Sequence, residues 1–318
     1  MPAVADRGCL NLEPGRRLRT PVAGIFLFLP LLARLRFDHL VTQAGYPGSE
    51  MIPATGALLS LLALKLLDKE RRSHIDDFSC DEALGLFAGL NVLPKKTFAT
   101  DYSYRAGRDQ QRRLLQGWVK ALGPVLFPEP EGSSLDFHPI PFRGDPDALD
   151  RHYLPLRGKA GPSVLTFFAL EQKSRCLCYS NANLTRNDQH GELMRFVESW
   201  HEVTGSDPKW LYFDSKVVDY PELSRVNRRE VHFVTIRRRG AALLRRLKER
   251  PASARKRAVI DIPKRCHTQI EYIEEVVRLR GYEGPIRQMA VTGLGRDRPT
   301  LFLSNDFEET PRELIIRN

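Results

Sequence analysis

The sequence predicts mixed α+β or α/β structure: a helical N-terminal domain, then a mixed β-sheet with flanking helices and a mainly β insertion. Three observations support this prediction. Residues 57–67 are apolar nearly all round a helix, which is typical of a buried helix. Further along the chain, apolar strands and amphipathic helices follow in the order β-β-β-α-β-α-β. The first and fourth of these strands each carry an aspartate in an apolar, aromatic setting.

The N-terminal part begins with a basic segment rich in proline and glycine, residues 1–20, which we expect to be disordered. Residues 21–123 are expected to form a helical domain. Within it, a short amphipathic helix should end at Gly89, and a turn then leads to a second helix. The second helix opens with Lys95 and Lys96 and contains Arg105. This outline fits a DNA-binding helix–turn–helix, and it fits an ordinary helical hairpin equally well.

Residues 124–133, rich in proline and glycine, are expected to be a linker, and residues 134–239 a core built on a β-sheet. The expected core strands are 134–139, 163–171, 175–181, one that ends near Asp214, and 231–237. A helix should begin after Asn187 and Asp188, which are good N-cap residues, and end at Gly205. A crossover through that helix lets the fourth strand lie parallel to the first, and this pairing would make Asp136 and Asp214 neighbours.

Two neighbouring carboxylates at strand ends form a hard oxygen site suited to Mg²⁺ or Mn²⁺. Taken singly, each aspartate is more often an ordinary strand-end residue. His138 lies two residues after Asp136 and should share its face of the strand, either to orient the site or simply to pack there.

Residues 240–305 are expected to be a β-rich insertion. It should hold a strand at 258–262, a helix through Ile270, Ile273 and Val277, and two strands at 286–291 and 300–303. Residues 306–318 should start a closing helix, with Thr310 as N-cap and Glu313 completing a capping box.

The charge of the chain is concentrated in one stretch. The 318 residues carry a net charge of +10. Residues 237–257 hold ten Lys/Arg and one acid, Glu249, and so supply +9 of it. Such a run is usually a solvated surface, but beside a metal site it favours a polyanionic partner.

Cysteine usage and hydropathy limit the setting of the protein. The five cysteines have no metal-ligand spacing, and no signal peptide is evident, so we expect reduced thiols in the cytoplasm. The apolar runs 22–35 and 57–67 are too short to span a membrane, and no membrane contact is expected.

The chain resembles DDE transposases of bacterial insertion sequences, which have an RNase H-like catalytic fold. The resemblance rests on Leu-Asp-Phe-His at 135–138, Trp-Leu-Tyr-Phe-Asp-Ser at 210–215 and the β-rich insertion, including 288–295 and 301–306. The helical stretch 81–105 is similar to the group's N-terminal DNA-binding region.

The resemblance implies a site of three carboxylates that hold two divalent ions, Mg²⁺ or Mn²⁺. Asp136 and Asp214 match two of them. The third is a Glu two or three turns into the closing helix, so we expect a chain truncated before it, with Glu313 as a possible substitute.

The resemblance also implies double-stranded DNA, transposon ends and target, as the partner. Lys95, Lys96, Arg105 and Arg237, Arg238 and Arg239 are the expected DNA contacts. A homodimer and a cytoplasmic, nucleoid-associated location in a bacterium fit the same group. Two functions stay open: a transposase that cuts and joins DNA, and an inactive, truncated form that only binds it. An RNase H-like nuclease with other substrates is a weaker reading.

Overall fold

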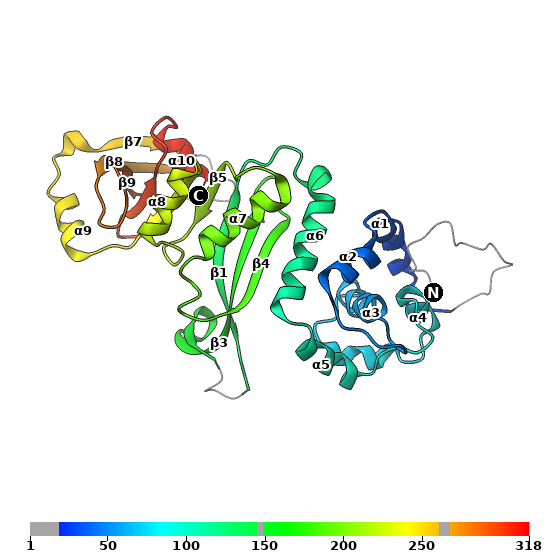
Figure 1. Ribbon diagram of the computed structural model, residues 1–318. Helices are drawn as coiled ribbons and strands as arrows, with labels where there is room; N and C mark the ends of the chain where they lie inside the picture. Colours follow the sequence, from blue (N-terminus) through cyan, green and yellow to red (C-terminus); the bar gives the residue numbers. More distant parts are fainter. Residues whose placement is uncertain (1–18, 145–148, 261–267, 318) are drawn as a thin grey trace. The chain divides into compact units, whose positions relative to one another are not determined.

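The computed structural model describes residues 19–144, 149–260 and 268–317. The basic segment 1–20 lies outside these ranges except for its last two residues. The chain divides into two compact units, one ending at Leu122 and the other beginning at Gly123. The first unit contains helices, and all the strands belong to the second, among the described residues (Figure 1).

The first unit is helical. Its elements are η2 (Ala23–Phe28), α1 (Leu29–Arg34), α2 (Phe37–Ala44), α3 (Ala54–Leu66), η3 (Arg72–Phe78), α4 (Glu82–Ala88), α5 (Lys96–Arg105) and most of α6 (Arg108–Leu126). The α3 helix is buried as predicted, and Ala63 and Leu64 pack in one core with Leu84 and Phe87 of α4.

The predicted pair of helices, α4 and α5, is present with the expected start and stop signals. Asp81 caps α4 by accepting a hydrogen bond from the Leu84 amide at 2.9 Å. Gly89 ends the helix with φ +66°, a left-handed conformation that a residue with a Cβ rarely adopts.

The expected linker 124–133 is shorter than predicted. The α6 helix continues to Leu126, and β1 (Ser133–Pro141) already begins at Ser133. Pro124 is tolerated because it lies in the last turn of α6, where one backbone hydrogen bond is lost rather than a helix interior broken.

The second unit is built on one mixed sheet. The remaining strands are β2 (Arg151–Leu154), β3 (Lys159–Glu171), β4 (Leu177–Leu184), β5 (Trp210–Phe213), β6 (His232–Arg237), β7 (Lys256–Val259), β8 (Gln269–Val277), β9 (Ile286–Thr292) and β10 (Thr300–Ser304). Their order is β2-β3-β1-β5-β6-β10-β9-β8-β7, and β4 also pairs with β3. The β1–β5 and β5–β6 pairs are parallel and the other pairs are antiparallel.

The strand pairing predicted for the core is confirmed. The strands β1, β3 and β4 form an antiparallel meander, and the chain then crosses through α7 (Glu192–Thr204) so that β5 lies parallel to β1. The start of α7 differs from the prediction, because the Asp188 carboxylate accepts from the Thr185 amide and hydroxyl, both at 2.9 Å, instead of capping the helix. The helix begins after Gly191 and ends at Gly205 as predicted.

The insertion differs from its prediction in two elements. The predicted helix through Ile270 and Ile273 is strand β8, which is paired on both sides by β7 and β9. The basic run instead contains a helix, α9 (Ala241–Lys248). The strands at 286–291 and 300–303 are present as β9 and β10, and they extend the main sheet because β10 pairs with β6. Of the strand expected at 258–262, the last two residues lie outside the described residues.

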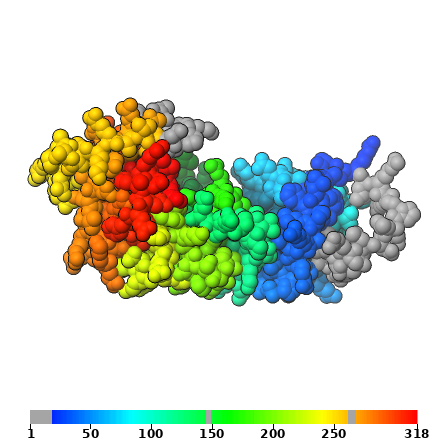
Figure 2. Space-filling view, turned by 90° about the horizontal axis from the view of Figure 1, so that it is seen from above, coloured from blue at the N-terminus to red at the C-terminus, as the bar shows by residue number. Residues whose placement is uncertain are grey.

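The sheet has two faces that the strand registers define. On the aspartate face lie Asp136, Tyr212 and Phe302, and α10 (Pro311–Arg317) packs there through Leu314. On the opposite α9 face, Leu247 of α9 packs on Ile273, Ala290 and Leu301. Figure 2 shows residues near the C-terminus (red) beside the orange residues that precede them in the same unit. None of the helices within the described ranges is both long and apolar enough to span a membrane.

Candidate active site

The two aspartates are brought together by the parallel pairing of β1 and β5. Leu135 and Phe213 form the last register pair of this ladder, and Asp136 and Asp214 are the residues that directly follow it on the two chain segments. Adjacent strands lie about 4.8 Å apart, and partners in register point to the same face. The sheet therefore presents the two carboxylates side by side, as the sequence predicted from the strand order.

Asp214 lies where β5 ends. Its side chain accepts a hydrogen bond from the Lys216 amide at 2.7 Å, an Asx turn that takes the chain out of the strand. Its backbone carbonyl accepts from Val217 at 3.3 Å and from the Thr235 hydroxyl of β6 at 3.4 Å. One oxygen of the carboxylate is thus held in place by the turn that follows the strand.

The environment of Asp136, including the charge of Asp214, shifts the pKa of its carboxyl. Although the Asp136 side chain is exposed, the strands around it remove part of its water, and this desolvation raises the pKa of its carboxyl. The negative charge of Asp214 raises that pKa further, while the positive charge of Lys216 lowers it. A cation bound between the two carboxylates would reduce this repulsion.

His138 lies on the same face as Asp136, and both side chains are exposed in the alternating pattern of β1. Its charge also acts on Asp136 and lowers the pKa of that carboxyl. The shared face agrees with the prediction, and the exposure disfavours the alternative of a packed strand histidine.

Lys216 and His152 are near the site, and sequence reasoning gave neither a role. Burial is the main cause that lowers the pKa of His152. The negative charge of Asp150 raises this pKa, and the positive charges of Arg186 and Lys216 lower it. His152 lies on β2, a strand that the sequence analysis did not predict, so no pattern pointed to it. Lys216 could have been found, because it lies two residues beyond Asp214 in a strand-end turn.

The two aspartates fit one divalent ion better than two. Mg²⁺ commonly takes one or two carboxylates and keeps several waters or substrate phosphate oxygens. Within residues 19–144, 149–260 and 268–317, no three His, Cys, Asp or Glu side chains are arranged to hold a metal. The third ligand that the resemblance implies is therefore not assembled in this part of the chain.

Glu313 is engaged elsewhere. Its exposed carboxylate accepts from the Thr310 amide at 2.9 Å and from the Thr310 hydroxyl at 2.7 Å, while its own amide donates to that hydroxyl at 3.3 Å. This is the predicted capping box at the start of α10, and it gives Glu313 a structural role instead of a ligand role.

The expected DNA contacts in the helical unit are partly taken up by neighbours. The Lys96 amide donates to Asp76 at 3.0 Å and its ammonium lies 3.5 Å from the same carboxylate. The Arg105 guanidinium lies over the rings of Phe98 and Tyr102, 5.5 and 5.4 Å from their centroids. Lys95 is exposed at the start of α5.

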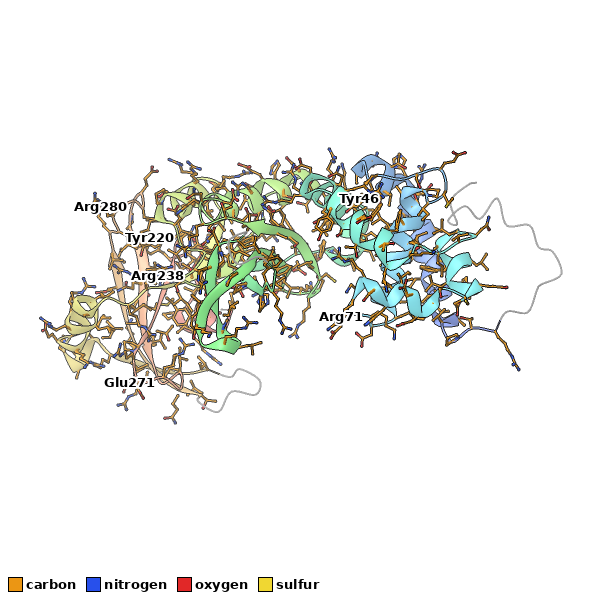
Figure 3. The ribbon with its side chains drawn as sticks, turned by 90° about the horizontal axis from the view of Figure 1, so that it is seen from below. Tyr46, Arg71, Tyr220, Arg238, Glu271 and Arg280 are labelled. Carbon is orange, nitrogen blue, oxygen red and sulfur yellow. The ribbon has the colours of Figure 1, made fainter. Side chains whose placement is uncertain are left out.

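The three arginines after β6 have different surroundings. Arg237 donates to Gln288, and Arg239 donates to the carbonyls of Arg298 and Pro299 at 3.5 and 3.3 Å. Arg238 is exposed (Figure 3). Of the three, Arg238 is therefore the one whose side chain is most available to a phosphate.

The basic run is partly neutralised by acids on β8. Glu275 binds Arg246 and Arg250, Glu274 lies 3.5 Å from Lys256, and Glu271 lies 2.9 Å from Arg257. Four of the ten cations counted in the sequence are thus paired. The paired cations tie the basic run to β8.

Comparisons with known proteins give only distant likenesses. The sequence matches no protein-family model and no curated protein. A similar solved structure is the piggyBac transposase synaptic complex with hairpin DNA, at 12% identity and a TM-score of 0.39 over 89% of this chain and 55% of that chain. Another is the catalytic domain of human endonuclease V, at 12% identity and a TM-score of 0.29 over 60% of this chain and 74% of that chain. The chain spans about half the length of the piggyBac chain it matches.

Proposed function

We propose that the protein is a metal-dependent DNA-processing enzyme of the DDE transposase type, with Asp136 and Asp214 as metal ligands. The observation that carries this proposal is the β1–β5 register, which sets the two carboxylates side by side at the end of a parallel strand pair. The proposal rests on the residues of this chain and on the resemblance of its motifs.

The strand arrangement supports the RNase H-like part of the proposal. An antiparallel meander leads through a helix into two parallel strands, and the first and fourth strands of this core carry the aspartates. Residues 240–305 then fit an insertion that extends the sheet, and the helical unit fits a DNA-binding domain.

The chemistry follows from the site. A bound Mg²⁺ or Mn²⁺ would supply Lewis-acid activation of an attacking water or hydroxyl and neutralise charge on the phosphate. Asp136 and Asp214 would hold and orient that ion, and the charge of Lys216 beside Asp136 would favour an approaching phosphate oxygen. Arg238 and Lys95, both exposed, would contact the DNA backbone.

A second function is favoured by one observation: no third ligand joins the two aspartates in the described part of the chain. A chain that binds one ion weakly and DNA well, without cutting it, fits that finding. A single assay distinguishes the two functions.

The assay is strand cleavage of a labelled duplex in Mg²⁺ or Mn²⁺. An enzyme should nick the duplex, and Asp136→Asn or Asp214→Asn should each lower the rate by at least about 10²-fold, the size of one lost electrostatic stabiliser. Asp77→Asn removes an exposed carboxylate of η3 and should change nothing. Binding without cleavage in the unaltered chain would support the second function, and cleavage that survives both aspartate changes would contradict the proposed site.

A further inference from the structure

The insertion contains a pocket of about 600 Å³ that the proposed active site does not use. Its floor is apolar, made by Leu244 and Leu247 of α9 with Ile273 and Ala290 of the sheet beneath them. Its rim is basic. The cations that line it are Arg239, Arg245, Lys248, Arg255 and Arg298, against the acids Glu271 and Asp297.

The pocket lies on the α9 face of the sheet, away from the two aspartates. Ile273, Ala290 and Leu301 are register partners on that face, one residue out of phase with Met289 and Phe302 of the aspartate face. The register places Asp136 and Asp214 with the latter set. Whatever binds here is therefore independent of the chemistry proposed for the aspartates.

The walls of the pocket are fixed by specific contacts. Arg239 donates to the carbonyls of Arg298 and Pro299 and so holds the β9–β10 turn at one end. That turn also passes close to β8, because a Cβ on Gly293 would come within 2.5 Å of the Gln269 carbonyl oxygen. On the other wall, the Thr292 hydroxyl donates to the Glu271 carbonyl at 3.2 Å.

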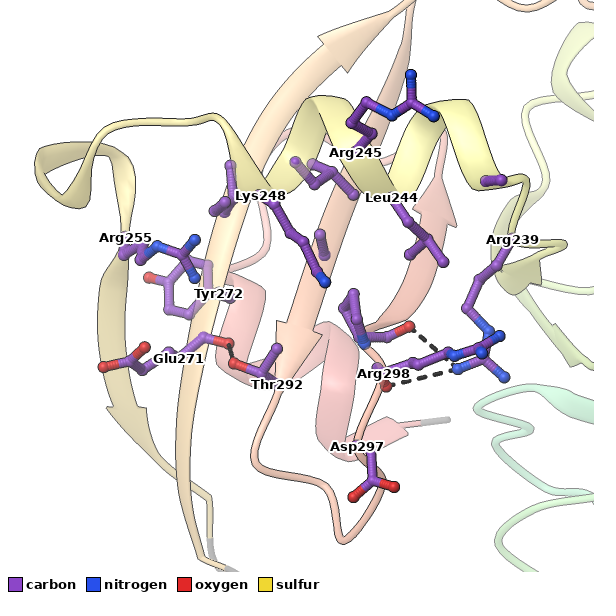
Figure 4. A pocket seen from close by; sticks show the side chains of 15 residues that line it. Arg239, Leu244, Arg245, Lys248, Arg255, Glu271, Tyr272, Thr292, Asp297 and Arg298 are labelled. Carbon is purple, nitrogen blue, oxygen red and sulfur yellow. Dashed lines mark hydrogen bonds between the residues drawn. The ribbon is translucent and has the colours of Figure 1, made fainter.

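The lining cations other than Arg245 lie around a common space. Figure 4 shows the Lys248 ammonium directed toward the middle of the pocket, Arg255 beside Tyr272 at one end, and Arg239 with Arg298 at the other. Arg245 points away from the others. Glu271, the acid on this wall, already pairs with Arg257 at 2.9 Å. Lys248 and Arg255 are both exposed, so their side chains are accessible to a ligand in the pocket.

We infer that this pocket binds a nucleotide, with its phosphates on the basic rim and its base on the apolar floor. Cations grouped without matching acids recognise phosphate oxygens through charge-assisted hydrogen bonds. The apolar floor of Leu244, Leu247, Ile273 and Ala290 suits the flat face of a base. The volume lies within the range of about 300–1,000 Å³ that small-molecule sites occupy. The nucleotide could be free or part of an unpaired nucleic-acid strand, because both offer this chemistry.

The test uses the full chain at an ionic strength of about 0.15 M, where long-range charge effects are screened. Three probes separate the sources: a labelled nucleoside triphosphate, a labelled single-stranded oligonucleotide, and inorganic pyrophosphate as competitor. The variant is Lys248→Ala with Arg255→Ala. The control is Arg278→Ala with Arg280→Ala, which removes the same charge from two exposed arginines beyond the far end of β8 (Figure 3).

The pocket variant should weaken binding by about tenfold or more, since each charge-assisted contact is worth roughly a factor of that order. The control should stay within about twofold, because remote exposed charges act only through a screened field. Loss for the triphosphate identifies a free nucleotide, and loss for the oligonucleotide alone identifies a strand.

Two results would overturn the inference. One is equal binding by the pocket variant and the control for both labelled probes. The other is pyrophosphate competing as well as the triphosphate, which would leave the apolar floor without a role. Asp214→Asn should leave this binding intact, so a failure here is distinguishable from a failure of the proposed active site. Far-ultraviolet circular dichroism of each variant checks that the fold is retained.

Discussion

At the scale of single residues, the site depends on two like charges that the fold forces together. Desolvation and the negative charge of Asp214 both raise the pKa of the Asp136 carboxyl, so the charged form of Asp136 is disfavoured in the folded protein. Carboxylates with pKa values perturbed in this way cluster at functional sites. Lys216 offsets part of the repulsion, and a divalent ion would offset the rest.

This repulsion has a consequence for stability. A carboxyl whose pKa is raised by folding binds its proton more tightly in the folded state, so the protein loses stability as the pH rises from the unfolded-state pKa of Asp136 through its folded one. Asp136→Asn should therefore raise the melting temperature at pH 7 in metal-free buffer, and the gain should shrink toward pH 3, where the carboxyl is protonated in both states. Thermal unfolding at the two pH values, with Asp77→Asn as control, measures it. An Asp136→Asn chain less stable than the control at pH 7 would show that the carboxylate stabilises the fold.

At the scale of elements, the core could be predicted because its signals are local and agree with one another. Alternating burial defines β1, Gly89 and Gly205 stop helices through left-handed conformations, and Thr310 with Glu313 forms its capping box. Pairing of the first and fourth strands then follows from the crossover rule.

The insertion could not be predicted in the same way. Ile270, Ile273 and Val277 fit a helical spacing, and only the pairing of this segment with β7 on one side and β9 on the other makes it a strand. The ion pairs of the basic run could not be predicted for the same reason. Its partners, Glu271, Glu274 and Glu275, belong to β8, and a misassigned β8 leaves the cations without visible acids.

The assignment of β8 as a strand can be tested by two substitutions. In a helix Ile273 and Val276 would share a face, whereas in β8 Ile273 is 6% exposed beneath α9 and Val276 is 62% exposed. Ile273→Ala should cost about 2–5 kcal/mol of unfolding free energy through the cavity it leaves. Val276→Ala should stay within about 0.5 kcal/mol. Urea unfolding gives both values, and similar large losses for the two variants would favour the helix.

At the scale of the whole molecule, most of the net charge of +10 comes from one stretch, residues 237–257. Four cations of the basic run are bound by β8 acids, and others gather round the α9 pocket. Arg238 is left exposed after β6. The chain thus groups several cations around the α9 pocket, on the face of the sheet opposite the two aspartates.

The central claim is that Asp136 and Asp214 share a divalent ion, and Mn²⁺ binding followed by electron paramagnetic resonance tests it most directly. The unaltered chain should bind one ion, and Asp136→Asn and Asp214→Asn should each abolish that binding, because neither carboxylate alone supplies enough charge for a hard cation. Asp77→Asn and Glu313→Ala should bind as the unaltered chain does, since one lies in η3 and the other caps α10. Unchanged binding in the two active-site variants, or loss of binding in Glu313→Ala, would contradict the account.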